Sequence, residues 1–586
     1  MRGAKGLMKI FLAGTVVATA MAVVSCASHS MAIPASASGS SNLPQSVIGA
    51  QPQVTMGVQS TPASGAKSYY VDCSQASNGT GTEASPWNSI ATANAEAYQP
   101  GDMIFFKRSA TCNGMFAPTG SGTVNAPITV TSYGAGPLPV IDGGTANPAA
   151  VYLTNQSYWT LENLELSEGT NWGLVAKALN NTAVYGLTLE NVIATGATSV
   201  AKQRALSGEI GLLADGTDNA TLNDVNISYV TAGDTKAGEG IFVKAGRHGD
   251  YYGAKGQNIS IKNSKISNVY GDGVLVADGE NVTISHNIVT ESGECPNCTG
   301  STPGALWVWN SVNVEMSWNE SYKNTSWAGD GGGMDIDYLN RNVTVEYNYI
   351  HDNKGYCVSV FGAGKQVTYK SIIRFNVCAN NAAQPTTTQK GDFLISTWGG
   401  GSLNGVQIYN NTTYWTAPLA SDYELTATFA TFSGTLRNFF MNNLVYTPLQ
   451  HPFLVSAPGA MKVDYNLYYS PNAAEYTFEY KGTVWNSFAE YQSGSGQDAH
   501  SVVADPRLGD PSYDVDNVWP KDQLRPQEGS PAIGGGTDVC VGSSPSACSM
   551  GLTDFFGKPL PNSGIWMGAI QEKYDQLSAA GSTNSQ

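Results

Sequence analysis

The sequence predicts an all-β fold built as a parallel β-helix, a solenoid of stacked coils. A short apolar strand recurs at a period of about 30 residues, and a second strand family that carries Asn interleaves with it. Helical periodicity is nearly absent, and 65 of the 586 residues are glycine. A propeller blade would be longer and would hold four hairpin-linked strands, whereas variable spacing between polar turns is typical of a parallel β-helix.

The first strand family predicts one wall of the solenoid. Alternate side chains of a strand share a face, so each copy presents one apolar set to the core and another set to the outside. The copies occupy residues 173–177, 211–215, 240–244, 273–277, 305–309, 333–337, 356–360 and 393–396.

The second strand family ends in Asn just past an apolar pair. Coils of a β-helix stack about 4.8 Å apart, so equivalent side chains lie over one another. We therefore expect a hydrogen-bonded amide ladder with a structural role, made by Asn287, Asn319, Asn348 and Asn376.

Both ends of the chain differ from the repeat. Residues 1–26 have basic residues before an apolar run and end in Val-Ser-Cys, which predicts an export signal with a lipobox-like end and lipidation at Cys26. Ordinary secretion, with cleavage near Ala35-Ser36-Ala37, is the alternative. We then expect a disordered linker (27–66), an N-terminal cap with the first coil (67–145), the β-helix (146–470), a final partial coil with a C-terminal cap (471–571) and a disordered tail (572–586).

Cysteine usage favours an oxidising compartment. Nine cysteines minus Cys26 leave eight, an even number. The CxxC at 295–298 has no second CxxC or His pair beside it, so a disulfide-closed turn is favoured over a zinc or redox site. The expected disulfides are Cys73–Cys112, Cys295–Cys298, Cys357–Cys378 and Cys540–Cys548.

The charge balance limits the partners. With 30 basic and 46 acidic residues the formal net charge is −16, which argues against nucleic acid and anionic membranes. We expect an exported monomer, either secreted or attached to the cell envelope through a lipid at Cys26.

Several segments resemble secreted, carbohydrate-active right-handed parallel β-helix proteins of the pectate-lyase-like superfamily. The segments 68–72, 78–80, 85–87 and 100–102 are similar to their N-terminal cap, and 529–534 and 564–569 to their terminal segment. The stretch 331–337, followed by 347–353, is similar to a recurring signature of the group. The resemblance covers about residues 68 to 571 and implies a carbohydrate substrate or ligand. The polygalacturonase pattern is absent, so the specific family stays open.

The candidate catalytic residues are two aspartates on the strand 333–337. Met334 and Ile336 point one way and Asp335 and Asp337 the other. Residues two apart on a strand have Cα atoms about 6.6 Å apart, which allows the carboxyl separation of either a retaining or an inverting glycosidase. Asp330, in the glycine-rich turn before the strand, is a third candidate. A calcium site that braces the solenoid is the structural alternative for the pair.

Aromatic and polar residues near these aspartates predict a sugar-binding groove. Trp307 and Trp309 occupy the same outward positions one coil earlier, and Trp398 follows the acidic coil. Sugar rings stack on such side chains, although packing beneath an adjacent turn is the alternative. The other expected site residues are Lys244, His351 as a further catalytic candidate, and Asp352.

A second site, apart from the aspartates, is a candidate for binding a cation. Glu239 and Asp272 precede the strands at 240–244 and 273–277 and are expected to stack, which suits Ca²⁺. No cofactor is required by the expected chemistry.

Three functions are consistent with this sequence. The first is a glycoside hydrolase that cleaves a polysaccharide by carboxylate acid/base chemistry. The second is a polysaccharide lyase that uses a cation and a basic residue, for which the candidates are Lys244, Arg247, His248, Lys323 and Lys365. The third is a noncatalytic glycan-binding or adhesive surface protein.

Overall fold

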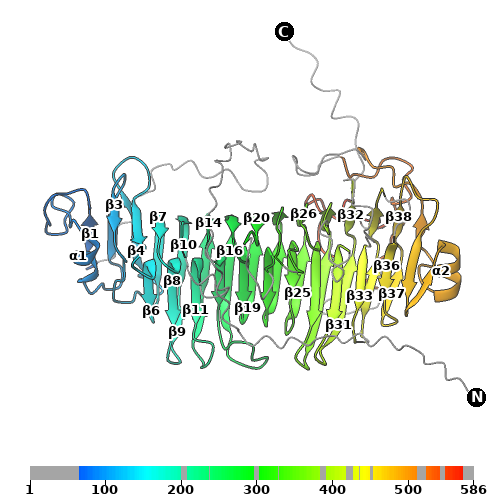
Figure 1. Cartoon of the computed structure of the whole chain (residues 1–586), viewed down its shortest axis with the longest axis horizontal. Coiled ribbons are helices and arrows are strands. Elements are labelled where there is room, and N and C mark those ends of the chain that lie inside the picture. Colours follow the sequence, from blue (N-terminus) through cyan, green and yellow to red (C-terminus); the bar gives the residue numbers. More distant parts are fainter. Residues whose placement is uncertain are drawn as a thin grey trace, which may run out of the picture.

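A computed structural model shows an elongated solenoid with the predicted parallel strands (Figure 1). It describes residues 65–198, 207–236, 238–295, 303–327, 329–382, 391–416, 427–434, 436–448, 453–510, 523–541, 548–561 and 563–571. Each coil contributes strands to three walls. The first wall is a 13-stranded sheet, and the second and third walls together form a 26-stranded sheet.

The first wall consists of parallel strands, with one antiparallel strand at its C-terminal edge. In spatial order they are β6 (Ala149–Thr154), β8 (Trp172–Ala178), β11 (Gly208–Ala214), β15 (Glu239–Lys244), β18 (Val274–Ala277), β21 (Leu306–Trp309), β24 (Met334–Ile336), β27 (Val358–Gly362), β30 (Phe393–Thr397), β33 (Thr428–Thr431), β36 (Phe453–Ala457), β39 (Thr477–Tyr480) and β40 (Thr483–Trp485).

The second wall runs from the N-terminal cap to the last coil. Its strands are β1 (Ser68–Val71), β2 (Met103–Lys107), β4 (Ile128–Tyr133), β7 (Trp159–Glu168), β10 (Leu187–Thr195), β13 (Val225–Ser228), β16 (Gly256–Lys262), β19 (Gly279–Ser285), β22 (Val312–Ser317), β25 (Arg341–Glu346), β28 (Val367–Arg374), β31 (Ser402–Tyr409), β34 (Asn438–Met441) and β37 (Met461–Asp464).

The third wall is joined to the second because β7 and β10 bend and pair within both. Its other strands are β3 (Thr111–Asn113), β5 (Val140–Gly144), β14 (Thr231–Thr235), β17 (Lys265–Val269), β20 (Ile288–Ser292), β23 (Glu320–Tyr322), β26 (Tyr349–His351), β29 (Val377–Ala379), β32 (Thr412–Tyr414), β35 (Leu444–Tyr446), β38 (Leu467–Tyr469) and β41 (Val502–Val503). A separate pair is formed by β9 (Ala183–Tyr185) and β12 (Thr221–Asn223).

The core lies between the three walls and follows the predicted alternation. Met334 and Ile336 are fully buried in it, so the aspartates between and after them face outward. Short helices lie at the two ends, α1 (Ile90–Asn94) and α2 (Phe488–Ser495), and Tyr491 of α2 stacks on Phe478 of β39 at a ring distance of 4.6 Å. Among the described residues, no helix is long and apolar enough to span a membrane.

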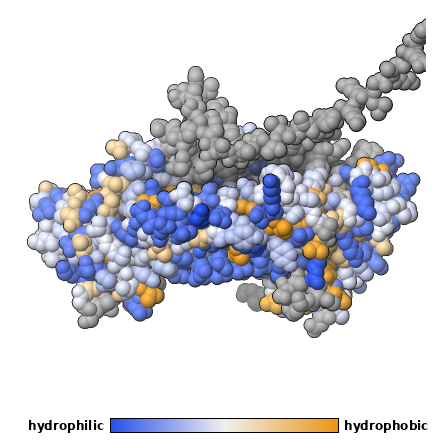
Figure 2. All heavy atoms as spheres, turned by 90° about the horizontal axis from the view of Figure 1, so that it is seen from below, coloured by the Kyte–Doolittle hydropathy of each residue, from blue (hydrophilic) through white to orange (hydrophobic). Residues whose placement is uncertain are grey.

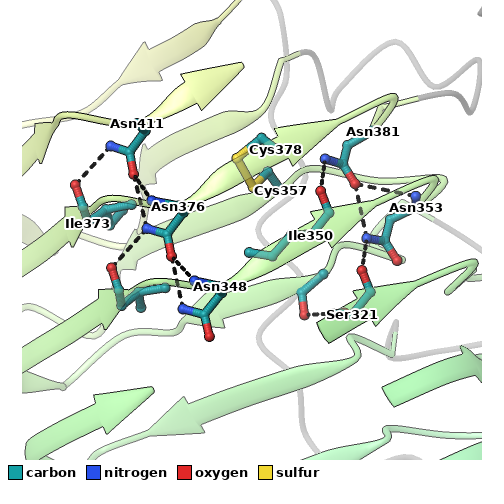
Figure 3. Close-up of a disulfide and its surroundings, with 12 residues drawn as sticks. Ser321, Asn348, Ile350, Asn353, Cys357, Ile373, Asn376, Cys378, Asn381 and Asn411 are labelled. Carbon is teal, nitrogen blue, oxygen red and sulfur yellow. Dashed lines mark hydrogen bonds between the residues drawn. A yellow bond between two sulfur atoms is a disulfide. The ribbon is translucent and has the colours of Figure 1, made fainter. Parts of the chain in front are cut away.

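The predicted amide ladder is confirmed at the bend between the second and third walls. Asn319 shows its geometry: its Nδ2 donates to Asn348 Oδ1 at 3.1 Å and to a backbone oxygen at 2.9 Å. The same pattern repeats along the buried amides Asn287, Asn319, Asn348, Asn376, Asn411, Asn443 and Asn466. A second ladder, Asn324–Asn353–Asn381, lies on the other side of the Cys357–Cys378 disulfide (Figure 3). Every rung is hydrogen-bonded to its neighbour, so burying these polar groups costs little free energy.

A column of rings lies on the outside of this bend, one residue before each amide. His286, Trp318, Tyr347 and Phe375 all have a positive φ, between 52° and 59°, which turns the chain sharply. Their rings stack at 6.2, 4.7 and 5.9 Å. This conformation is uncommon for bulky residues, so the stacking offsets local backbone strain.

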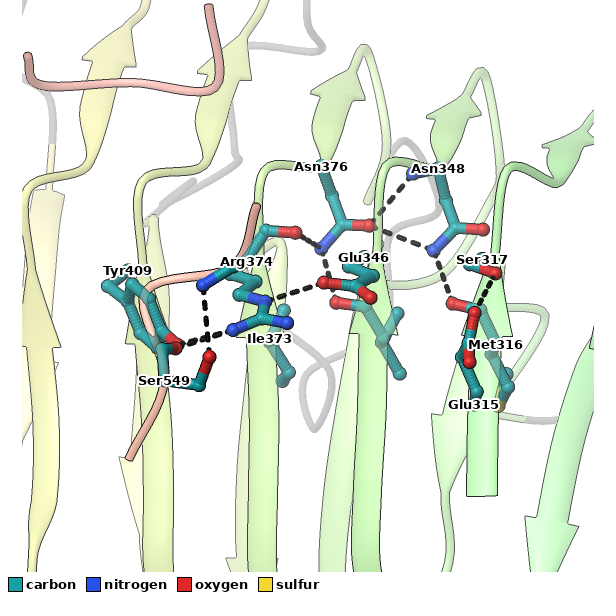
Figure 4. A network of polar contacts seen from close by, with 12 residues as sticks. Glu315, Met316, Ser317, Glu346, Asn348, Ile373, Arg374, Asn376, Tyr409 and Ser549 are labelled. Carbon is teal, nitrogen blue, oxygen red and sulfur yellow. Dashed lines mark hydrogen bonds and ion pairs between the residues drawn. The ribbon is translucent and has the colours of Figure 1, made fainter. Parts of the chain in front are cut away.

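The C-terminal segment returns along the side of the solenoid. Its Leu524, Phe555 and Met567 are buried in one cluster with residues of the third wall. Arg374 holds the segment at a further point, because its guanidinium bonds Glu346 Oε2 at 2.6 Å and also the Ser549 carbonyl (Figure 4). The region that we expected to cap the solenoid edge thus also covers a lateral face.

The disulfides follow the sequence prediction where the structure describes both cysteines. Cys73–Cys112, Cys357–Cys378 and Cys540–Cys548 are bonded. Cys298, the expected partner of Cys295, and Cys26 lie outside the described residues. The face of the solenoid in Figure 2 is largely hydrophilic, with small apolar patches.

Candidate functional site

The predicted aspartates project from the outer face of the first wall. In the strand register Asp335 lies between Trp307 of β21 and Ser359 of β27. Its carboxylate accepts a hydrogen bond from Ser359 Oγ at 2.6 Å, and Asp335 is only 9 % exposed. Just past the end of β24, the Asp337 N–H donates to the Val308 carbonyl at 3.1 Å, which places Asp337 next to the end of β21 that carries Trp309.

Exposure separates the three candidate acids. Asp330 and Asp337 are both partly exposed, whereas Asp335 is buried. Asp337 Oδ1 accepts the Tyr338 N–H at 2.8 Å, which fixes the carboxylate against its own turn. Burial and then the Asp337 charge raise the pKa of Tyr338 to about 12. Asp330 and Asp337 are therefore the acids that solvent or a ligand can reach.

Tyr356 stands among these carboxylates, and our sequence analysis did not single it out. It is 2 % exposed. Burial and then the charges of Asp335, Asp330 and Asp337 hold the pKa of its hydroxyl well above the usual value. The ring packs on Gly332, where an added Cβ would lie 2.1 Å from its Cε2 atom. The glycine-rich turn thus makes room for Tyr356, and its place as the first residue of the strand copy 356–360, where most other copies begin with Gly, was the available signal.

An aromatic track runs beside the aspartates across four coils. We define it as Trp309, Tyr338, Trp398 and Phe361, whose consecutive ring distances are 5.6, 5.9 and 5.3 Å. Trp398 is 43 % exposed, and Trp309 and Tyr338 are partly exposed. Trp307 lies deeper, at 8 % exposure, in an apolar cluster on the outer face of the first wall. The predicted tryptophans therefore divide into a buried one and two that surface molecules can contact.

A cleft of about 660 Å³ opens next to the track. One side is the loop 246–255, between β15 and β16, and the other is formed by Tyr338, Leu339, Gly364 and Gln366. The loop is fixed to distant coils, since Arg341 Nη2 donates to the Tyr251 carbonyl at 3.0 Å and the Tyr251 hydroxyl donates to the Val367 carbonyl at 3.3 Å. The volume of the cleft lies within the range of small-ligand sites.

Lys244, His351 and Asp352 have other partners. Lys244 Nζ donates to the Asp215 carbonyl at 3.0 Å, and burial lowers the pKa of the ammonium group. The His351 ring belongs to the third wall, where it lies 2.7 Å from Asp352 and 3.2 Å from Glu320. Burial opposes its protonation, but these hydrogen bonds prevail and raise the pKa of His351. The contacts of this buried histidine, which is 3 % exposed, are those of a structural ion network.

The candidate cation ligands Glu239 and Asp272 bind backbone amides. Glu239 Oε2 accepts the Asp272 N–H at 2.7 Å, and Asp272 Oδ1 accepts the Gly304 N–H at 2.8 Å. Both residues are fully buried. They stack as predicted, and each carboxylate links one coil to the next. Within the described ranges, the grouping of three metal-type donors is Cys357, Cys378 and Asp392, and its two cysteines are already bonded to each other.

A family model confirms the architecture. The model of the right-handed beta helix region matches residues 147–311 and 210–413, which form the central part of the parallel walls. Over this region the chain folds as a right-handed β-helix.

This right-handed β-helix protein has distant relatives of known activity. It is 22 % identical over 464 residues to a lacto-N-biosidase of Bifidobacterium longum subsp. longum, an alignment that covers 60 % of the chain and 28 % of the relative. The crystal structure of a GH136 lacto-N-biosidase from Eubacterium ramulus is 17 % identical, with a TM-score of 0.48 over 70 % of this chain and 68 % of that one. The pectate lyase Pel9A is 14 % identical, with a TM-score of 0.37 over 87 % and 98 %.

Proposed function

We propose that the protein is a glycoside hydrolase that cleaves a neutral glycan on the outer face of the first wall. The observation that carries this proposal is the cluster of Asp330, Asp335 and Asp337 beside the aromatic track. Carboxyl groups supply acid, base or nucleophile to glycosidic bonds, and aromatic rings bind the apolar faces of sugars.

The partly exposed pair, Asp330 and Asp337, is our choice for the reacting groups. A proton donor must come within hydrogen-bond reach of the glycosidic oxygen, which the buried Asp335 does less readily. Hydrolysis by this pair needs one carboxyl group that holds a proton and one that is ionised. Asp335, bonded to Ser359, then helps to set the charge of the site and to position its neighbours.

The sequence similarity to a lacto-N-biosidase supports a glycosidase over a lyase. Two of the five basic groups expected for a lyase have other partners, since Lys244 is bonded to a backbone carbonyl and Arg247 is paired with Asp250. The disulfides support an extracytoplasmic site of action. Attachment through a lipid at Cys26 is part of the proposal.

The test is a panel of neutral and uronate-containing glycans, including p-nitrophenyl lacto-N-bioside. New reducing ends that disappear in Asp337→Asn and Asp330→Asn would support hydrolysis by this pair. Unsaturated products that absorb ultraviolet light would instead show a lyase. Binding without turnover, unchanged in both variants, would indicate a noncatalytic glycan-binding protein.

A further inference from the structure

We infer that the cleft beside loop 246–255 is a subsite that binds a neutral sugar unit, with His248 as its hydrogen-bonding group and the rings of Trp309 and Tyr338 as its stacking surface. The inference rests on the proposed function, since it names where the glycan next to the aspartates is held. From the sequence, His248 was expected only as one of several basic groups for a lyase, and the structure gives it a different setting.

The orientation of His248 is fixed by a buried carboxylate. Its Nδ1 lies 3.2 Å from Asp278 Oδ2, and Asp278 is fully buried. The other oxygen, Oδ1, accepts the Gly249 N–H at 3.1 Å and Asn310 Nδ2 at 2.6 Å. Because a carboxylate only accepts hydrogen bonds, Nδ1 donates to it, and Nε2 on the opposite edge of the ring is the hydrogen-bonding group left for the cleft. The His248 side chain is 28 % exposed and lines the cleft.

Anchoring the loop does not by itself require this histidine. The loop is also held by Asn310 Nδ2 on the Asp250 carbonyl, by Arg341 on the Tyr251 carbonyl and by the Tyr251 hydroxyl. Arg341 further lies over the Tyr251 ring at 4.2 Å. The exposed edge of His248 is therefore available for a ligand rather than for the fold.

The rings supply the second half of the subsite. His248 stands edge-on to Trp309 at 4.4 Å, and Tyr338 lies 5.6 Å beyond Trp309. An apolar ring face beside a fixed hydrogen-bonding group matches a pyranose, which has an apolar face and hydroxyl groups around its rim. Thr217 and Gln366 line the same cleft and add hydroxyl and amide groups.

The charges in the cleft favour a neutral sugar over a uronate. Its charged lining residues, Arg247 and Asp250, pair with each other at 3.2 Å. A uronate carboxylate would have to compete with Asp250 for the guanidinium. A neutral sugar needs only hydrogen bonds and ring contacts, which the cleft supplies.

The position of the subsite explains how it would serve the reaction. The Asp337 N–H bonds the carbonyl of Val308, the residue before Trp309, and Tyr338 is the residue that follows Asp337. A sugar stacked on these rings therefore places the adjoining glycosidic bond near Asp337. Holding one sugar in this way converts a diffusive encounter into an oriented one.

The test compares His248→Ala and Trp309→Ala with a matched control, His500→Ala. His500 also pairs with an aspartate, Asp464 at 3.0 Å, and stacks on a tyrosine at 4.4 Å, but it does not line the cleft. KM and kcat are measured on the best neutral glycan of the panel, and binding of that glycan is measured by calorimetry on Asp337→Asn carrying each substitution. We expect binding to weaken about tenfold in both cleft variants and to stay unchanged in the control. His248→Gln keeps a hydrogen-bonding group and serves if the alanine variant does not fold.

The outcomes distinguish the subsite from the hydrolase proposal. Turnover of a neutral glycan with unaltered binding in both cleft variants would overturn the subsite and leave the hydrolase proposal standing. Binding of neutral glycans that depends on His248 and Trp309, without any turnover, would retain the subsite and overturn the hydrolase proposal. Preference for uronate glycans would overturn the neutral-sugar assignment, and binding of no glycan in the panel would overturn both.

Discussion

Replacing one buried ladder amide by a carboxyl tests the account of how the coils are joined. Asn348 is fully buried; its Oδ1 accepts two hydrogen bonds from Asn319, and its Nδ2 donates to Met316 O and Asn376 Oδ1, both at 2.9 Å. Asn348→Asp keeps the acceptor but turns an oxygen toward two other oxygens. The side chain must therefore hold a proton, with which it restores one of the two lost bonds.

The expected cost depends on pH. The remaining lost bond costs about 1–2 kcal/mol at any pH. An unfolded aspartate releases its proton near pH 4. Keeping this proton in the folded state at pH 7, roughly three pH units higher, adds about 4 kcal/mol to the cost. Because the folded pKa is the raised one, this second cost vanishes below pH 4 and grows as pH rises. We expect a loss of about 5 kcal/mol at pH 7 and about 1–2 kcal/mol at pH 4.

The assay is urea unfolding at both pH values, with Asn342→Asp as the control. Asn342 donates to Asn313 in an exposed amide stack, and its φ of 58° is one that aspartate tolerates. Its loss should stay within about 0.5 kcal/mol. Equal, pH-independent effects of the two substitutions would refute the claim that the buried ladder stabilises the solenoid.

Four other substitutions give direct readings. Asp337→Asn should lower kcat by about 10²–10⁴-fold, and Asp335→Asn by less, as measured on the glycan that the panel identifies; the reverse order would assign the chemistry to Asp335. Gly332→Ala should displace the Tyr356 ring, because the new Cβ would lie 2.1 Å from that ring. We expect a loss of about 1–3 kcal/mol of stability and a loss of activity. Full activity at the original melting temperature would show that the turn can accommodate the extra carbon. Burial raises the pKa of Asp392 to about 8, so the folded state keeps a proton that the unfolded state releases, and stability should fall as pH rises from 4 to 8. Asp392→Asn should flatten this decline, measured as melting temperature against pH. An unchanged slope in the variant would contradict the prediction.

The fold could be predicted because its signals are local and repeated. Strand geometry alone predicts that Met334 and Ile336 face the core while Asp335 faces outward. The recurring Asn alone predicts the amide ladder. The alignment of Gly211 with Gly173 was wrong: the strand register pairs Gly211 with Val175, so Glu209 stands opposite Gly173. This two-residue slip is invisible to the inside–outside pattern, because it leaves every side chain on the same face.

The site depends on contacts that the repeat does not encode. Tyr356 reaches the aspartates because a glycine in another coil leaves room for its ring. The cleft exists because loop 246–255 extends across several coils to Arg341 and Val367. Such long-range contacts carry no periodic signal, whereas the aspartates themselves were visible as polar residues in an apolar column.

The returning C-terminal segment has a consequence for biogenesis. Ser549 meets Arg374 across 175 residues of sequence, and Trp566 meets Asn410 across 156. Coils can assemble one upon another as the chain is made, but the column of rings at Trp318 and Tyr347 is covered only when the segment around Gly551 and Gly557 arrives. A chain that ends before this segment would expose those aromatic rings to its neighbours, so premature termination should yield aggregates rather than a shorter folded solenoid.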